Sequence, residues 1–96
     1  MTAGVRVPQV SDLRGAIELY WRKTEIGTND ICKLFGVNRQ RAGKLKEVAR
    51  DLMETRSTIN YDARCVNTEV AYEAWGLEIG NLERRYAKIR KLEGEQ

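Results

Sequence analysis

The feature that most constrains the fold is Gly36, which lies between two segments with helical spacing. Apolar residues recur every three or four positions after Thr28: Ile31, Leu34 and Phe35. A second set follows Asn38, a typical N-cap residue: Ala42, Leu45, Val48, Ala49, Leu52 and Met53. Glycine readily adopts the left-handed conformation in which many helices end. We therefore predict two helices joined by a tight turn, the first capped by Thr28 and the second ending near Glu54.

Three further helices are predicted, one before this pair and two after it. One runs from an N-cap at Ser11 to about Lys23 and carries apolar residues at helical spacing: Leu13, Ala16, Ile17, Tyr20 and Trp21. Another begins at Asn67 or Thr68 and closes at Gly76, and a last one begins near Asn81. The spacing is lost over residues 55–66, where residues 58–61 fit either a loop or a short β element.

The chain length allows one compact core, because 96 residues are too few for two. We expect a mainly all-α domain of five helices over residues 11–93, with a C-terminal helical hairpin over 67–93. Residues 1–10, which hold Gly4 and the only proline, are expected to form a flexible arm. The residues expected to be most buried are Trp21, Phe35, Leu45, Leu52 and Trp75.

The residue types argue against catalysis and against a metal site. The chain has no histidine, the side chain most used for proton transfer and for metal binding. Cys32 and Cys65 are far apart and neither forms a C-x-x-C pair, so both are expected to be reduced and to pack as small apolar residues. We predict no catalytic residue, no cofactor and no metal, and therefore no enzyme.

No apolar run is long enough to cross a bilayer, and the start of the chain lacks the pattern of a secretory signal. We therefore expect no membrane partner, and a cytoplasmic location.

Positive charge is concentrated in the middle of the chain. The net charge is +3 overall, but residues 37–64 hold seven basic and four acidic side chains. Four of the basic residues fall within eight positions that contain no acid: Arg39, Arg41, Lys44 and Lys46. Such a local field attracts phosphate.

The second helix of the pair is predicted to have a distinct outer side. At about 100° per residue, an inner side centred on Leu45 leaves five residues facing outward: Arg39, Gln40, Gly43, Glu47 and Arg50. Lys44 and Lys46 fall on the two flanks. This arrangement suits a helix in the DNA major groove, with outward groups at the base edges and the lysines at phosphates.

The stretch TNDICKLFGVNRQRAGKLK resembles the helix-turn-helix of bacterial and bacteriophage DNA-binding regulators over about a fifth of the chain. The pattern requires apolar residues before and after the turn, a small residue where the helices cross, and the glycine itself. These are Ile31, Cys32, Phe35, Gly36, Val37, Ala42 and Leu45.

The expected DNA contacts divide into two groups. Base contacts fall to the outward residues Arg39, Gln40, Gly43, Glu47 and Arg50. Arg39 is suited to guanine and Gln40 to adenine, and Gly43 permits close approach. Glu47 either accepts from cytosine or limits how deeply the helix inserts. Phosphate contacts fall to five residues: Thr28, Asn38, Arg41, Lys44 and Lys46. Thr28 and Asn38 could equally serve only as caps, and Arg41 as a packing residue.

A weaker copy of the turn occurs later in the chain, where Trp75-Gly76-Leu77 repeats the pattern of Phe35-Gly36-Val37. The copy places Tyr72 where a small residue is needed and Arg85 where an apolar one is needed. We therefore interpret the second copy as a structural hairpin.

The predicted function is sequence-specific binding of double-stranded DNA, as a transcriptional regulator or as a recombination or packaging factor. A homodimer is expected, because one helix in one groove buries little surface. The last helix offers a surface for it, or else completes the monomer's own core: Ile79, Leu82, Tyr86 and Ile89. The alternative function is a non-enzymatic adaptor that applies the basic helix to an acidic protein partner.

Overall fold

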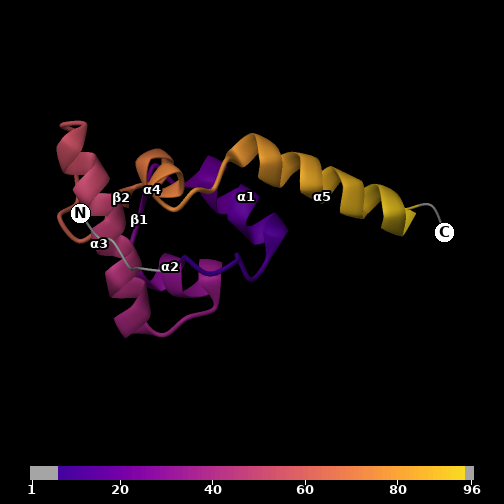
Figure 1. Cartoon of the computed structure of the whole chain (residues 1–96), viewed down its shortest axis with the longest axis horizontal. Coiled ribbons are helices and arrows are strands. Elements are labelled where there is room, and N and C mark those ends of the chain that lie inside the picture. The colour runs from indigo at the N-terminus through magenta and orange to yellow at the C-terminus, as the bar shows by residue number, and fades with distance from the viewer. Residues whose placement is uncertain (1–6, 95–96) are drawn as a thin grey trace.

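The computed structural model describes residues 7–94, which form five helices and two short strands (Figure 1). In chain order they are α1 (Leu13–Arg22), β1 (Glu25–Ile26), α2 (Thr28–Phe35), α3 (Arg39–Thr55), β2 (Val66–Asn67), α4 (Thr68–Ala74) and α5 (Ile79–Gly94). The prediction of a small, mainly helical fold with a short β element is confirmed. Most of the predicted N-terminal arm, residues 1–6, lies outside the described part, whereas Val7 and Val10 pack against the core.

The core forms around α3, which packs against α2, α4 and β2. The aromatic rings of Phe35 and Trp75 meet edge to face at 5.2 Å between centroids. The indole N–H of Trp75 donates to the carbonyl of Leu45 at 2.8 Å, and the Tyr72 hydroxyl donates to the carbonyl of Ala16 at 2.6 Å. These two bonds satisfy polar atoms of buried aromatic residues and join α4 to α3 and to α1.

The turn between α2 and α3 is confirmed in its main features. Gly36 has φ of 66°, in the left-handed region, and the Asn38 side chain accepts from the backbone N–H of Arg41 at 2.9 Å. The predicted cap at Thr28 is wrong by one residue, because Gly27 is the N-cap and Thr28 begins α2. The carboxylate of Asp30, the third residue of α2, accepts from the backbone N–H of Gly27 at 3.2 Å, which is the bond that the N3 side chain makes in a capping box.

The predicted N-cap at Ser11 is also wrong. Asp12 occupies the N-cap position of α1. The Ser11 hydroxyl instead donates to the carbonyl of Lys33 at 2.7 Å, near the end of α2. Ser11 therefore fastens the start of α1 to α2, a long-range contact that local capping rules do not anticipate.

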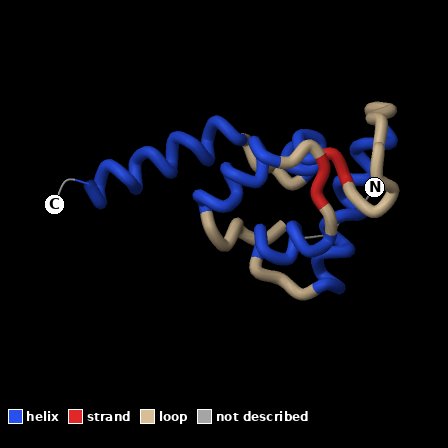
Figure 2. Tube along the Cα trace, turned by 180° about the vertical axis from the view of Figure 1, so that it is seen from behind, coloured by secondary structure: helices blue, strands red, loops and turns tan. Residues whose placement is uncertain are grey.

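The β element lies elsewhere than predicted. The two strands are antiparallel, with Ile26 opposite Val66 and Glu25 opposite Asn67 (Figure 2, red), and residues 58–61 are not a strand. The reason is burial: Ile26 and Val66 are both completely buried, whereas Ile59 and Tyr61 are exposed. Two apolar residues far apart in the sequence enter the core side by side, and their backbones pair.

The two strands begin two similar units, β1-α2-α3 and β2-α4-α5. Each unit turns at a glycine with positive φ, Gly36 at 66° and Gly76 at 74°. Ile26 pairs with Val66, its equivalent in the other unit, and Phe35 contacts its own equivalent, Trp75. An approximate twofold relation therefore connects the beginnings of the two units.

The relation fails at the last helix of each unit. α3 packs against α2, whereas α5 packs mainly on α1 and extends away from the body (Figure 1). Tyr72 is buried where α2 has Cys32, and Arg85 is exposed where α3 has the buried Leu45. α5 has Arg85 in place of the apolar Leu45, and α4 has the bulky Tyr72 where the two helices would cross. The second unit therefore lacks the features that hold α3 across α2.

Two of the five predicted core residues are not among the most buried. Trp21 is 64% exposed, lies edge-on to Tyr20, and donates from its indole nitrogen to Glu83. Leu52 is only half-buried. Helical spacing identified which side of α1 and α3 faces inward. It did not identify the positions on that side, Trp21 and Leu52, that neighbouring elements leave uncovered or only half covered. The other three predictions, Phe35, Leu45 and Trp75, are confirmed.

Candidate nucleic-acid interface

Helix α3 has one buried side and one exposed side, as the spacing predicts. Ala42, Leu45 and Ala49 are completely buried against the rest of the fold. On the other side, five polar residues are exposed: Arg39, Gln40, Arg41, Lys44 and Glu47. We call the surface formed by Arg39, Gln40, Gly43, Lys44 and Glu47 the outer face of α3.

Gly43 lies in the middle of the outer face. A Cβ built at Gly43 would meet no atom within 4 Å of the described residues, so the glycine is not required for packing within the chain. Glycine within a helix lowers stability by roughly 0.5–1 kcal/mol relative to alanine. Packing within the chain therefore does not explain why this position is a glycine, which lowers the stability of the helix. Its consequence is an open surface between Gln40 and Glu47.

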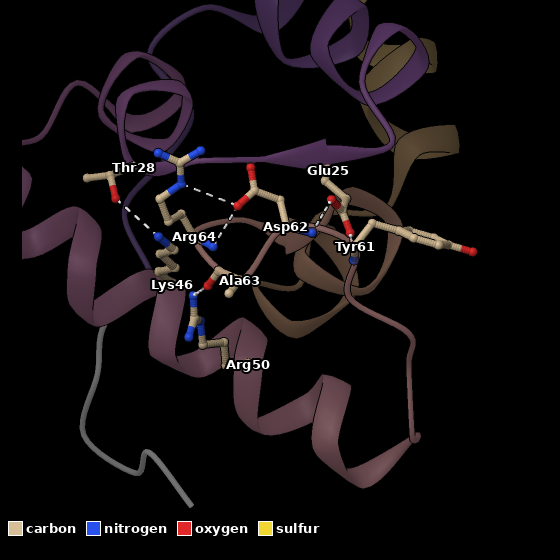
Figure 3. Close-up of polar contacts among 8 residues, drawn as sticks. All are labelled: Glu25, Thr28, Lys46, Arg50, Tyr61, Asp62, Ala63 and Arg64. Carbon is tan, nitrogen blue, oxygen red and sulfur yellow. Dashed lines mark hydrogen bonds and ion pairs between the residues drawn. The ribbon is translucent and has the colours of Figure 1, made fainter.

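Arg50 does not lie free on the outer face. Its guanidinium is half-buried beneath the loop of residues 56–65 and donates to the carbonyl of Ala63 (Figure 3). The loop is held from its other side by Glu25, whose carboxylate accepts from the backbone N–H groups of Tyr61 at 2.8 Å and Asp62 at 3.1 Å. Arg50 thus positions the 56–65 loop beside α3.

Thr28 and Lys46, both predicted phosphate contacts, come together beside the outer face. The Lys46 ammonium donates to the Thr28 hydroxyl at 3.4 Å (Figure 3). Burial lowers the pKa of Lys46, and the positive charge of Arg50 lowers it further. No ion pair within residues 7–94 involves Lys46. An anion bound there would relieve the electrostatic cost of this partly desolvated cation.

A groove of about 690 Å³ surrounds Lys46. It runs between the start of α2, the start of α3 and the end of the 56–65 loop. Its charged lining contains two acids, Asp30 and Asp62, and five bases: Lys23, Lys33, Arg39, Lys46 and Arg64. We call this the basic groove, and the N-terminal end of α2, the positive end of its dipole, borders it.

The two acids of the basic groove already have partners. Lys23 approaches Asp30 at 3.1 Å, and Arg64 approaches Asp62 at 3.4 Å. Hydrogen bonds from Arg64 lower the pKa of Asp62. Arg39 donates to the side chain of Asn29 at 2.7 Å, a neutral partner. The groove therefore keeps a surplus of positive charge next to the outer face of α3.

The structure places the ten predicted contact residues in four settings, and Arg39 borders two of them, the outer face and the basic groove. Arg39, Gln40, Gly43, Glu47, Lys44 and Arg41 lie on or beside the outer face; Thr28 and Lys46 lie in the basic groove. Asn38 is used as a cap, and Arg50 lies under the loop.

The prediction missed Lys23, Lys33 and Arg64. Lys33 lies within the helix-turn-helix stretch but is on its first helix, and Lys23 and Arg64 lie outside that stretch. Only the pairing of β1 with β2 brings the 56–65 loop to α2, and no local signal in the sequence marks Arg64.

The described part of the chain shows no other chemical centre. Within residues 7–94, no three histidine, cysteine, aspartate or glutamate side chains gather where they could hold a metal ion. Cys32 and Cys65 are free and half-buried, and burial raises the pKa of the Cys65 thiol. None of the described helices has the length and apolar character needed to span a bilayer. Comparison of the chain with protein-family models, curated proteins and solved structures finds no match.

Proposed function

We propose that this protein binds double-stranded DNA by placing the outer face of α3 in the major groove. The observation that carries the proposal is the continuity of two surfaces: an exposed polar helix face with an open glycine at its centre, and a basic groove along one edge. A face of this kind fits base edges, and a groove of this charge fits the phosphates on one wall.

The residues take distinct roles in this arrangement. Gln40 and Glu47 face the bases, and Arg39, which Asn29 holds at the border of the basic groove, reaches bases and the adjacent phosphate. Lys33 and Lys46, which form no ion pair within residues 7–94, neutralise phosphates from the groove side. Lys44 and Arg41 do so from the opposite flank of α3. Arg50 acts indirectly, by holding the 56–65 loop that carries Arg64.

The role that fits such a surface is that of a regulator of transcription, or of a DNA-recognition factor in recombination or packaging. Sequence preference would come from the side chains of α3, and each good bidentate base contact discriminates by about 1–3 kcal/mol.

Salt dependence tests the proposal. Binding to random duplex DNA, followed by fluorescence anisotropy, should weaken steeply as salt rises, because bound lysines release counterions from phosphate. Replacing Lys44 and Lys46 together by alanine should reduce the slope of log K against log salt by about 0.9 for each phosphate that is no longer neutralised. The matched control is Arg84→Ala with Lys88→Ala on α5, which should leave the slope unchanged. Absence of duplex binding at low salt would instead favour an acidic protein partner.

Gly43→Ala separates stability from binding. The added methyl group meets open space, so it should stabilise α3 by roughly 0.5–1 kcal/mol and raise the melting temperature. In the complex the same methyl group would lie against DNA, where overpacking costs about 1–3 kcal/mol, and affinity should fall roughly tenfold. Gly94→Ala, equally open but at the end of α5, is the control. Unchanged affinity would show that α3 does not approach DNA at Gly43.

A further inference from the structure

We propose that α5 pairs with α5 of a second copy of this chain in antiparallel orientation, through the half of each helix that extends from the body and exposes Ile89 and Leu92. This inference goes beyond DNA binding and does not depend on it.

The first observation is the position of α5. The helix has 16 residues, a length of about 24 Å, and extends from the body in both views (Figures 1 and 2). Its first half packs on α1, where Leu82 is buried. Beyond Tyr86 its apolar residues lack cover, with Ile89 43% and Leu92 75% exposed. The free half therefore exposes apolar surface.

The second observation is where the exposed apolar residues lie. The five large apolar residues exposed in the described part are Trp21, Ile59, Tyr61, Ile89 and Leu92. Two belong to the 56–65 loop. The other three are Trp21, whose indole N–H donates to Glu83 of α5 at 3.1 Å, and two residues on the free half of α5, Ile89 and Leu92. Exposed apolar side chains gathered on the free half of one helix mark an interaction site.

The third observation is the charge pattern, which selects both the partner and its direction. The apolar residues of α5 recur by three and four, as in a two-helix seam: Ile79, Leu82, Tyr86 and Ile89. In a parallel pair, Glu83 would oppose Glu78 of the second copy, and Arg90 would oppose Arg85. Both contacts are repulsive, so the parallel arrangement is disfavoured.

An antiparallel pair removes this conflict. If Tyr86 of each copy packs against Ile89 of the other, Glu83 lies beside Arg90 of the second copy, and the symmetry of the pair repeats this contact. In the same register, Leu92 of each copy lies on the other flank of the seam, beside Arg85 of its partner. One arrangement thus covers Ile89 and Leu92 and pairs the charges.

The test measures association of the full chain by sedimentation equilibrium without DNA. Glu83→Arg alone and Arg90→Glu alone should each weaken the dimer roughly tenfold, because two attractive contacts become repulsive. The double variant should restore association to within about twofold. A parallel dimer predicts the opposite for each single variant, since new attractive contacts with Glu78 or Arg85 would strengthen it. Stronger association of the single variants would overturn the antiparallel arrangement.

A second comparison addresses the apolar contact. Ile89→Asp should make the chain monomeric, and at concentrations where the parent chain is also monomeric it should leave the melting temperature unchanged, because Ile89 is already partly exposed in the single chain. Ile59→Asp, an equivalent change in the 56–65 loop, should leave association intact. A parent chain that stays monomeric at about 1 mM overturns the proposal and leaves the proposed DNA binding standing.

Discussion

Trp75→Ala is expected to cost about 3–5 kcal/mol of folding free energy, because a large aromatic side chain leaves a packed core. Trp75 is 4% exposed and lies between Phe35 and Tyr72, with ring centroids 5.2 and 6.1 Å away. It also donates its indole N–H to the carbonyl of Leu45. The total stability of a small domain is typically about 5–15 kcal/mol, so the variant should lose a large part of its free energy of unfolding. Thermal unfolding followed by circular dichroism measures the loss.

Trp21→Ala is the matched control for this change. It removes the same side chain from a position that is 64% exposed and whose indole nitrogen is bonded only to the exposed Glu83. The free energy of unfolding should change by no more than about 1 kcal/mol. Comparable losses in the two variants would contradict the structure's division between a buried Trp75 and an exposed Trp21.

The elements that were predictable from the sequence are those that local chemistry determines. Gly36 marks a left-handed turn, because only glycine adopts positive φ without strain. Asn38 caps the start of α3, because its side chain satisfies a free backbone N–H. Helical spacing then assigns Leu45 to the inside and Gln40 to the outside. Each of these signals lies within a few residues of the feature that it predicts.

The features that were missed depend on contacts between distant segments. The apolar spacing of α1 includes Trp21, but whether a neighbour covers that residue depends on the direction of α5. Ile26 and Val66 form strands because they meet in the core, and two residues give too short a pattern to recognise. The same pairing places the 56–65 loop over Arg50 and brings Arg64 to the basic groove.

The outer face of α3 is tested most directly by reversing its charge. Arg39→Glu with Lys44→Glu should weaken binding to duplex DNA at fixed salt by at least about 100-fold, because two attractive interactions with DNA are replaced by two repulsive ones. Both side chains are exposed, so the fold should be retained.

The deciding measurement compares this variant with Arg84→Glu and Lys88→Glu on α5, which change the net charge by the same amount. Both control residues are exposed. At physiological salt they act on DNA only through a screened field, so affinity should fall by no more than about threefold. A large loss confined to the α3 variant is the predicted result. Equal losses in both variants, or duplex binding by the α3 variant as strong as that of the parent chain, would contradict DNA recognition by the outer face of α3.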